Sequence, residues 1–363
     1  MRHIIIIVGE ELQINKPFLD YVFSSYESHF GELGMVYYIQ NSDKELPFYI
    51  ENHSKNFDFI TIIANDSNFY TLSKILATLT TDTIELKDET LIPSRAQIYT
   101  KDSFLLDLNS ASINLIKAEP TKKLPQILIN IDLESQFFNI LDIDKESARI
   151  LLEPLATTYN VNISLTELLS GLTYVRAGAN KYGQIKGFID SASNLFANKI
   201  INDKSIVSFI AKKLIQKNQK ITFAESCTAG LCASKIGSVP GVSRAFDGSV
   251  ITYANHIKHN WIDVENSILE TFGAVSKECV EQMCFGALKL CECDYAIAIS
   301  GIAGPDGGSK EKPVGTVFVA VANKNGDVQT SRLLLEGDRD YIREQSALHA
   351  YALLLRANPS LFI

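Results

Sequence analysis

The sequence lacks a block of lysine and arginine, and its 363 residues carry a net charge of -8. Without such a block the electrostatic footprint of a nucleic-acid-binding protein is missing, so we expect no nucleic-acid partner. No apolar run approaches the length of a membrane span. The run Ile4–Val8 is too short for the core of a signal peptide, and Gly9 and two glutamates follow it directly. We therefore expect a cytoplasmic protein with no membrane association, whose first apolar run is a buried strand.

Cysteine is confined to one region, since all six cysteines lie between Cys227 and Cys293. They form no C-x-x-C pair, and no histidine follows them at zinc-finger distance. Free cysteine behaves as a small buried hydrophobe, and disulfides are rare in a reducing compartment. The pattern predicts buried free thiols, with no metal and no cofactor.

Apolar residues make up 46% of the chain and charged residues 21%, which is typical of a globular protein, and the length favours two domains. In the first part, predicted strands alternate with predicted helices. The strands are Ile4–Val8, Phe59–Ala64 and Gln126–Ile131, and the helices are Leu19–Phe30 and Phe69–Leu79. This alternation predicts an α/β domain over residues 1–140, with a parallel sheet covered on both faces.

Residues 141–200 have a weaker pattern, with helical spacing at Glu146–Leu155 and Leu165–Leu172. We predict a connecting module there and assign it no fold. Residues 201–363 return to a clear alternation that predicts a three-layer α/β/α domain. Its predicted helices are Asp203–Gln216, Ser276–Leu290 with Ser276 as N-cap, and Asp338–Leu355; its predicted strands are Ile221–Ala224, Gly248–Tyr253, Asp294–Ile299, Val314–Val321 and Gln329–Leu335.

Four polar clusters follow predicted elements of this last domain, and the first is Ala224–Gly230. Ser226 falls where a strand turns into a helix, so its hydroxyl has backbone N–H groups beside it that could stabilise an oxyanion. That position suits a nucleophile. It equally suits an N-cap, since serine is common at such turns.

The second cluster contains Tyr253 and Lys258, just past a strand. A lysine acts as a general base when burial lowers its pKa, and serine–lysine pairs are a variant of the catalytic triad. The alternative is a solvated lysine beside a core tyrosine.

The third cluster is Ser300–Gly308, with four glycines in eight residues directly after a strand. Glycines let backbone N–H groups approach a ligand closely, so the loop favours phosphate or carboxamide contacts over a purely structural turn. It is not a Walker A loop, because Ser309 and not glycine precedes Lys310.

The fourth cluster, Gly337–Arg343, opens the last helix. Arg339 or Arg343 could hold a phosphate through two parallel hydrogen bonds. The alternative is a helix start that Asp338 caps, with both arginines in water.

Taken together, these clusters and the shorter motifs Val239–Gly241, Gly273–Ser276 and Lys312–Thr316 resemble the C-terminal domain of the CinA family of competence/damage-inducible proteins. The resemblance covers about 160 residues in several motifs that occur in order. Standalone members of that domain are nicotinamide-mononucleotide amidohydrolases. The resemblance therefore implies an amidase that converts nicotinamide mononucleotide to nicotinate mononucleotide and ammonia. It also implies a homo-oligomer, most simply a dimer.

Carried over to matching positions, the resemblance makes Ser226 the nucleophile and Lys258 and Tyr253 the groups that activate it. The remaining matched positions become substrate-binding residues. They are Glu225, Cys227, Thr228, Gly230, Ser300, Gly301, Ile302, Ala303, Gly304, Gly308, Arg339 and Arg343. Ser300 stands where relatives often have threonine, and Ala229 stands where many have glycine.

The first 200 residues resemble the other half of the family only through Gly9–Leu12 and Leu91–Pro93. Full-length members carry a molybdopterin-type domain there, with a pyrophosphatase activity on ADP-ribose-like nucleotides. Here Asn65–Phe69 replaces the glycine-rich turn and its acidic pair, so a divalent metal would lose its oxygen ligands. We interpret the domain as degenerate. Two alternative functions remain. One is an ADP-ribose pyrophosphatase activity of this domain, and the other is nucleotide binding linked to competence, without catalysis.

Overall fold

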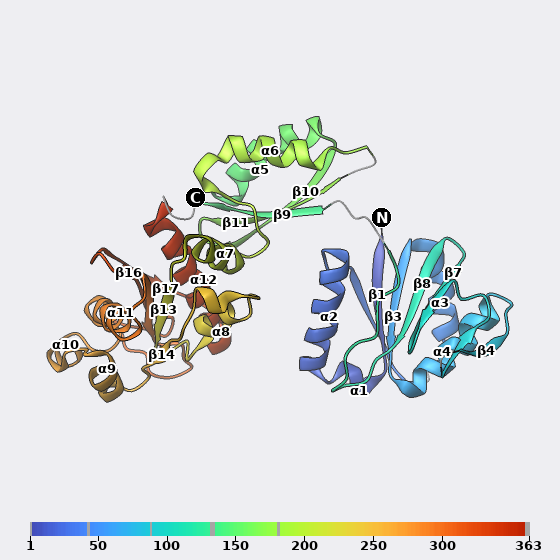
Figure 1. The fold of residues 1–363 in the computed structure, drawn as a ribbon, viewed down its shortest axis with the longest axis horizontal. Coiled ribbons are helices and arrows are strands. Elements are labelled where there is room, and N and C mark those ends of the chain that lie inside the picture. The colour runs from blue at the N-terminus through green and yellow to red at the C-terminus, as the bar shows by residue number, and fades with distance from the viewer. Residues whose placement is uncertain (1, 42–43, 88, 131–134, 180–181, 360–363) are drawn as a thin grey trace. The chain divides into compact units, whose positions relative to one another are not determined.

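The computed structural model describes residues 2–41, 44–87, 89–130, 135–179 and 182–359. The chain forms two compact units, Met1–Glu134 and Ser135–Ile363. Both are built from sheets covered by helices, as Figure 1 shows for each, so the α/β class is confirmed. None of the helices in the described ranges combines the length and the apolar character that crossing a bilayer requires.

The first unit contains a six-stranded sheet in the order β2-β1-β3-β8-β7-β6 and a separate β4-β5 hairpin. Its strands are β1 His3–Val8, β2 Met35–Ile39, β3 Phe59–Ala64, β4 Ile84–Lys87, β5 Thr90–Pro93, β6 Ile98–Thr100, β7 Ser103–Leu108 and β8 Ala111–Lys117. Its helices are α1 Glu10–Gln13, α2 Lys16–Phe30, α3 Leu46–Asn56 and α4 Asp66–Leu79. Strands β1, β2, β3 and β8 are parallel, and β7 pairs antiparallel with both β8 and β6.

The continuous apolar run of β1 is explained by burial on both faces. Ile4 and Ile6 join the core under α3 and α4, whereas Ile5 and Ile7 join the core under α2. A strand covered on both sides has no solvent face and therefore no polar alternation. The predicted strands Ile4–Val8 and Phe59–Ala64 and the two predicted helices of this domain are confirmed.

The predicted strand at Gln126–Ile131 is wrong, although Ile131 itself lies outside the described residues. Residues 126–130 form an irregular segment whose apolar side chains join the core beside α2. Hydrogen bonds from side chains, and not from a neighbouring strand, pair backbone groups of this segment. Asn114 Oδ1 accepts from the N–H of Leu128 at 2.7 Å, and the Ser103 hydroxyl donates to the carbonyl of Gln126 at 2.8 Å. The apolar run therefore reflects burial without strand pairing.

The second unit begins with an antiparallel four-stranded sheet in the order β10-β11-β9-β12, called here the middle sheet. Its elements are β9 Ser135–Leu141, α5 Lys145–Thr158, β10 Val161–Leu169, β11 Leu172–Ala179, α6 Ile185–Phe196, the short 3-10 helix Ala197–Lys199 and β12 Ile200–Ile201. The predicted helix at Leu165–Leu172 is wrong, because Ser170 and Gly171 form the turn of the β10-β11 hairpin. Gly171 has a φ of 73°, which favours glycine.

The C-terminal sheet has the order β14-β13-β15-β16-β17. Its strands are β13 Ile221–Glu225, β14 Val250–Ile251, β15 Tyr295–Gly301, β16 Thr316–Asn323 and β17 Val328–Leu334; its helices are α7 Ile206–Lys217, α8 Leu231–Gly237, the 3-10 helix Val242–Arg244, α9 Asn255–Ile262, α10 Asn266–Thr271, α11 Lys277–Cys291 and α12 Arg339–Ala357. Strands β13, β14 and β15 are parallel, so their carboxyl ends meet at one edge.

Helices cover both faces of the C-terminal sheet, which confirms the predicted three layers. Large side chains such as Phe223 and Ile297 pack against α7, α8 and α12, whereas alanines such as Ala298 and Ala320 pack against α11. The predicted N-cap Ser276 is confirmed, because its hydroxyl accepts from the N–H of Cys279 at 3.2 Å. The predicted strand Gly248–Tyr253 is shorter than expected, since only Val250 and Ile251 pair with β13.

The middle sheet is joined to the C-terminal domain by a shared core and is not a free linker. Leu141, Leu169 and Leu172 pack in the same cluster as α7 and α12. Arg356 on α12 donates to the Asp142 carboxylate at 2.7 Å. The sheet also begins at Ser135, before the predicted boundary at residue 140.

Candidate active site

Ser226 lies at the carboxyl end of β13, in the turn that leads to α8. Its N–H donates to the carbonyl of Ile299 at 2.9 Å, which extends the pairing of β13 with β15 by one residue. The residue is 8% exposed, so its hydroxyl lies at the base of the site and not on the open surface. The sequence placed this serine at a strand-to-helix turn, and the structure does the same.

Lys258 brings a buried amine to this hydroxyl. It lies on α9, and its side chain runs back towards the residues that follow β14. Its Nζ is 3.1 Å from Ser226 Oγ, 2.6 Å from the carbonyl oxygen of Thr252 and 3.0 Å from that of Tyr253. The residue is 0% exposed. A lysine that is fully buried against a serine contradicts the alternative of a solvated side chain.

Burial lowers the pKa of Lys258 from its ordinary value, because desolvation disfavours the ammonium form. Within the described residues no carboxylate forms an ion pair with it, so no anion offsets that penalty. The nearby thiols of Cys227 and Cys279 would oppose the shift only as thiolates. Burial raises the pKa of both thiols to about 11, so they are neutral at physiological pH.

Glu225 stabilises the turn that follows β13 through its carboxylate. Its carboxylate is fully buried and accepts from the backbone N–H groups of Gly230 at 2.9 Å, Cys232 at 3.2 Å and Ala233 at 2.9 Å. These are the first N–H groups of α8, which a helix leaves without internal partners. The start of α8 is therefore occupied by Glu225 and offers few donors to an oxyanion.

Two donors closer to Ser226 remain. Neither the N–H of Cys227 nor that of Thr228 donates to another residue in the described part of the chain. Both belong to the turn that directly follows Ser226. They are the backbone groups best placed to stabilise negative charge on a carbonyl oxygen attacked by Ser226.

The phenol of Tyr253 lies with Arg339, whereas only its backbone carbonyl touches Lys258. Arg339 Nη2 donates to the Tyr253 hydroxyl at 3.0 Å, and Nη1 donates to the carbonyl of Gly304 at 2.7 Å. Arg339 thus links α12 to the two loops that flank the site. Both Tyr253 and Arg339 are exposed, and they form the rim of the site.

Arg343, one helical turn further along α12, braces the nucleophile turn. Its Nη2 donates to the carbonyl of Thr228 at 3.0 Å, and its Nη1 pairs with Asp340 at 3.0 Å. Asp338 caps α12 by accepting from the N–H of Tyr341 at 2.8 Å. The helix cap that the alternative interpretation predicts, at Asp338, is present. Both arginines nevertheless reach the site and are not free in water.

The loop Ser300–Gly308 uses three of its glycines to pack against the start of β16. A Cβ atom would lie 2.7 Å from Val317 at Gly301, 2.7 Å from Val314 at Gly304 and 2.8 Å from the Val314 nitrogen at Gly308. Ile302 and Ala303 continue this packing: the Ile302 N–H donates to the carbonyl of Thr316 at 2.9 Å, and Ala303 is buried. Their tight packing brings Gly304 to Arg339.

Several buried polar atoms on the turns after β13 and β14, on β15 and β16, and on α12 have no hydrogen-bond partner within the described residues. They are Thr228 Oγ1, Thr252 Oγ1, Ser300 Oγ, Thr316 Oγ1 and Arg343 Nε. Buried polar atoms are nearly always paired in proteins, so such a group marks a place for water or a ligand. Sequence reasoning missed Thr252 and Thr316. A threonine directly after a short strand, as at Thr252, is the signal that could have pointed to the first of them.

The sequence pattern of the CinA C-terminal domain matches residues 203–358. This region contains every side chain of the site described above. The nicotinamide-nucleotide amidohydrolase PncC of Enterobacter agglomerans is 45% identical over 147 residues, which cover 40% of this chain and 90% of that protein. The chain belongs to the CinA family.

A CinA-like protein of Fervidobacterium nodosum is 42% identical over 179 residues, which cover 48% of this chain and 44% of that protein. The chain therefore spans less than half the length of this curated relative. Among solved structures, the competence/damage inducible protein CihA from Agrobacterium tumefaciens is 35% identical, with a TM-score of 0.41, and the match covers 42% of this chain and 96% of that one. The similarity to these CinA proteins falls in the C-terminal region.

Ala229 marks a departure from the glycine that the resemblance leads one to expect in this family. It is exposed in the nucleophile turn and has a φ of 50°, in the left-handed region that favours glycine. Gly230 follows with a φ of 94°. The turn after Ser226 therefore needs two consecutive left-handed residues, and only one of them is glycine.

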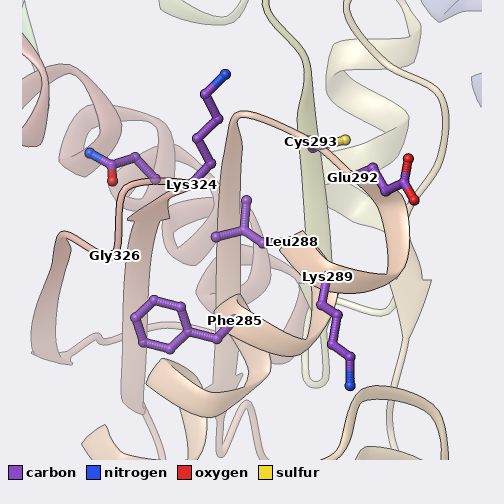
Figure 2. A pocket seen from close by; sticks show the side chains of 8 residues that line it. Phe285, Leu288, Lys289, Glu292, Cys293, Lys324 and Gly326 are labelled. Atoms are coloured by element: carbon purple, nitrogen blue, oxygen red, sulfur yellow. The ribbon is translucent and has the colours of Figure 1, made fainter.

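A hollow on the surface of this CinA domain lies at the opposite end of the sheet. Phe285, Leu288 and Lys289 of α11 line it together with Cys293 and the β16-β17 turn at Lys324 (Figure 2). Its two lysines pair with Asp263 and Asp294. Among the described residues no three His, Cys, Asp or Glu side chains gather closely enough to hold a metal ion. Neither Ser226 nor Lys258 lines the hollow.

Proposed function

We propose that this chain is an amidohydrolase that deamidates a nicotinamide nucleotide, most simply nicotinamide mononucleotide, to the nicotinate nucleotide and ammonia. The observation that carries the proposal is the 3.1 Å contact between the buried Lys258 Nζ and Ser226 Oγ. A serine hydroxyl is a weak nucleophile and needs a positioned acceptor for its proton. The name of the Enterobacter agglomerans relative supports the choice of substrate.

In the first half of the reaction, neutral Lys258 accepts the proton of Ser226. A neutral amine has two N–H groups and one lone pair. The N–H groups donate to the carbonyls of Thr252 and Tyr253, which leaves the lone pair for the Ser226 hydroxyl. Ser226 Oγ bonds to the carboxamide carbon, and the carbonyl electron pair moves to oxygen. The N–H groups of Cys227 and Thr228 stabilise that oxyanion.

Collapse of the oxyanion breaks the C–N bond. The Lys258 ammonium gives its proton to the leaving nitrogen, so ammonia departs and Ser226 holds the acyl group as an ester. Lys258, neutral again, then accepts a proton from water as the water attacks the ester. The ester bond breaks, Ser226 Oγ regains a proton from Lys258, and nicotinate nucleotide forms as the carboxylic acid, which gives its proton to solvent and leaves as the carboxylate.

Arg339 is the better candidate for the phosphate of the nucleotide. It is exposed at the rim and uses two of its five N–H groups, on Gly304 and Tyr253. Arg343 is half-buried and braces Thr228 from inside. The pyridinium charge of the substrate would further disfavour the ammonium form of Lys258. Ser300 Oγ and Thr228 Oγ1 supply polar contacts at the base of the site.

We propose that the chain acts as a homodimer in the cytoplasm and that residues 1–140 are a degenerate molybdopterin-type domain. The amidase domain that we propose begins near residue 201, and the middle sheet that packs against it begins at Ser135. Neither an ADP-ribose pyrophosphatase nor a binding protein without catalysis would release ammonia from nicotinamide mononucleotide. An assay of ammonia release therefore separates both alternatives from the amidase.

Ammonia release from nicotinamide mononucleotide by the purified full-length chain tests the proposal. We expect turnover by the wild type, none by Ser226→Ala, and normal turnover by Ser234→Ala, which removes an exposed serine of α8. Binding of the nucleotide to Ser226→Ala should survive, because the hydroxyl acts in the chemical step. An inactive wild type that binds the nucleotide would point to a binding protein instead.

A further inference from the structure

A second cleft of about 230 Å³ lies where the middle sheet meets the C-terminal domain. Asn139 of β9 lines it from the middle sheet, the start of α7 lines it with Lys204 to Val207, and Lys235 of α8 and Glu344 of α12 close the other side. None of its lining residues belongs to the Ser226–Lys258 pair. The shared core around Leu172 fixes the two walls relative to each other.

The buried amide of Asn139 has an acceptor that nothing fills. Its neighbours Phe138 and Ile140 point to the core under α5 and α6, so Asn139 points to the opposite face of the middle sheet. Its Nδ2 donates to the carbonyl of Asp203 at 2.8 Å, which fixes the orientation of the amide. Its Oδ1 is buried and has no partner within the described residues, and the whole residue is 0% exposed. An occupant of the cleft would satisfy this atom with an O–H or N–H group.

The start of α7 and two lysines lie on the other side of the cleft, where the carboxylates of Asp203 and Glu344 are already paired with Lys212 and Lys235. Ser205 caps the 12-residue helix by accepting from the N–H of Ser208. Within the described residues the N–H groups of Ile206 and Val207 donate to no acceptor. The positive end of a helix dipole with free N–H groups binds phosphate readily.

The two lysines, Lys204 and Lys235, line the same cleft as the start of α7. Lys204 precedes the helix, with its ammonium 4.9 Å from the centre of the Phe137 ring. Lys235 pairs with Glu344 at 2.5 Å, and the Glu344 side chain is half exposed. The Glu344 carboxylate can therefore turn to water when an anion takes its place beside Lys235. Two ammonium groups and a helix start favour a doubly charged anion over a carboxylate.

We propose that this cleft binds a small phosphate ester that carries hydroxyl groups, a compound of the sugar-phosphate class. Its phosphate lies at the start of α7 between Lys204 and Lys235, and one of its hydroxyls donates to Asn139 Oδ1. The site is separate from the amidase centre and does not depend on the proposed reaction.

Calorimetric titration of the full-length chain with ribose 5-phosphate, inorganic phosphate and ribose tests the proposal. Ribose 5-phosphate should bind about tenfold more tightly than inorganic phosphate, because only the sugar reaches Asn139. Ribose alone should bind much more weakly. Replacing both Lys204 and Lys235 by alanine should weaken both phosphate ligands by at least about tenfold, whereas Lys217→Ala at the far end of α7 should have no effect.

Two further variants locate the site. Asn139→Leu should remove the preference for ribose 5-phosphate over inorganic phosphate; the lysine variants carry the test if this substitution unfolds the protein. Arg339→Ala should leave binding at the cleft intact. Loss of binding in Arg339→Ala with full binding in the double lysine variant would assign the ligand to the amidase centre and overturn the proposal. Absence of saturable binding in the wild type would show that the cleft holds only water, and would overturn it as well.

Discussion

The two units place polar side chains at the same position of their sheets, the carboxyl ends of parallel strands, with opposite results. In the first unit Asn65 Nδ2 donates to Glu11 at 2.6 Å, and Asn68 Nδ2 donates to Asn65 and Asn41 at 2.7 Å each. Lys117, at the end of β8, pairs with Asp102 at 2.8 Å. Each of these side chains is satisfied by another part of the protein.

At the corresponding edge of the C-terminal sheet, where its parallel strands end, several polar groups lack a hydrogen-bond partner within the described residues. Thr228 Oγ1 and Ser300 Oγ have no partner within the described residues, and Lys258 is buried without an ion pair. Such groups cost stability, by about 1–3 kcal/mol for each buried unsatisfied atom. A fold retains them where a ligand or a reaction uses them. The comparison shows that unmet hydrogen-bonding capacity, more than polar composition, distinguishes the candidate active site from the closed cluster around Asn65.

The largest expected difference between the two edges is in their chemistry. The full chain should release ammonia from nicotinamide mononucleotide but no AMP from ADP-ribose, with or without Mg²⁺. The reason is that Asn65, Asn68 and Glu11 bind one another and offer a metal a single carboxylate. Chromatographic detection of AMP is the measurement. Metal-dependent AMP above the blank would show that the closed cluster is catalytic and would break the comparison.

Truncation should show how much the middle sheet contributes to the stability of the C-terminal domain. The sequence alone predicts that residues 201–363 suffice for activity, since every matched residue lies there. The structure favours a start at Ser135, because Leu141, Leu169 and Leu172 pack in the C-terminal core. Loss of these leucines should lower the free energy of unfolding by about 3–6 kcal/mol. Urea unfolding of 135–363 and 201–363 checks this, and equal stability would contradict the shared core.

Replacing Arg339 and replacing Arg343, both on α12, should change different kinetic constants, KM in the first case and kcat in the second. Arg339→Ala should raise KM for the nucleotide by about 10–100-fold and KM for the dephosphorylated nucleoside far less, because a charge-assisted phosphate contact is lost. Arg343→Ala should lower kcat for both substrates alike, since it braces the Thr228 carbonyl. Arg332→Ala on β17 is a matched control. Equal effects of Arg339→Ala on both substrates would show that Arg339 does not bind the phosphate.

The smallest expected effect concerns the nucleophile turn. Ala229→Gly should stabilise the protein by up to about 1 kcal/mol, because glycine adopts the left-handed conformation without strain. Ala233→Gly, inside α8, is the matched control and should destabilise it by about 1 kcal/mol. Thermal unfolding measures both. A destabilised Ala229→Gly would mean that the turn tolerates alanine without cost.

Much of the fold could be predicted where local pattern and tertiary environment agree. The strand Phe59–Ala64 and the helix that Ser276 caps follow from an apolar run and a capping serine. Leu165–Leu172 could not be assigned correctly, because leucines at helical spacing also occur where one strand ends, a turn intervenes and the next begins. In residues 126–130 the sequence shows burial but not the side chains of Asn114 and Ser103 that replace strand pairing.

In the candidate site the sequence supplied the residue types and the structure supplied their partners. The approach of Lys258 to Ser226 depends on β14 lying beside β13. Only two residues of each strand take part in this pairing, and no local pattern predicts it. Glu225 was expected to contact substrate, yet its carboxylate is occupied by the start of α8. The resemblance made Tyr253, together with Lys258, a group that activates Ser226, and the structure pairs the phenol of Tyr253 with Arg339.

The most direct test of the account compares two neighbouring residues of α9, the buried Lys258 and the exposed His256. The measurement is kcat/KM for ammonia release from nicotinamide mononucleotide between about pH 6 and about pH 10. Only neutral Lys258 accepts a proton, and burial lowers its pKa, so wild-type activity should rise with pH to a plateau below the ordinary lysine pKa of about 10.4. Lys258→Ala and Lys258→Arg should lose at least about 1,000-fold, because neither supplies a neutral amine, while His256→Ala should keep the wild-type profile. Loss of activity in His256→Ala with retention in Lys258→Ala would contradict the account and assign the proton transfer to histidine.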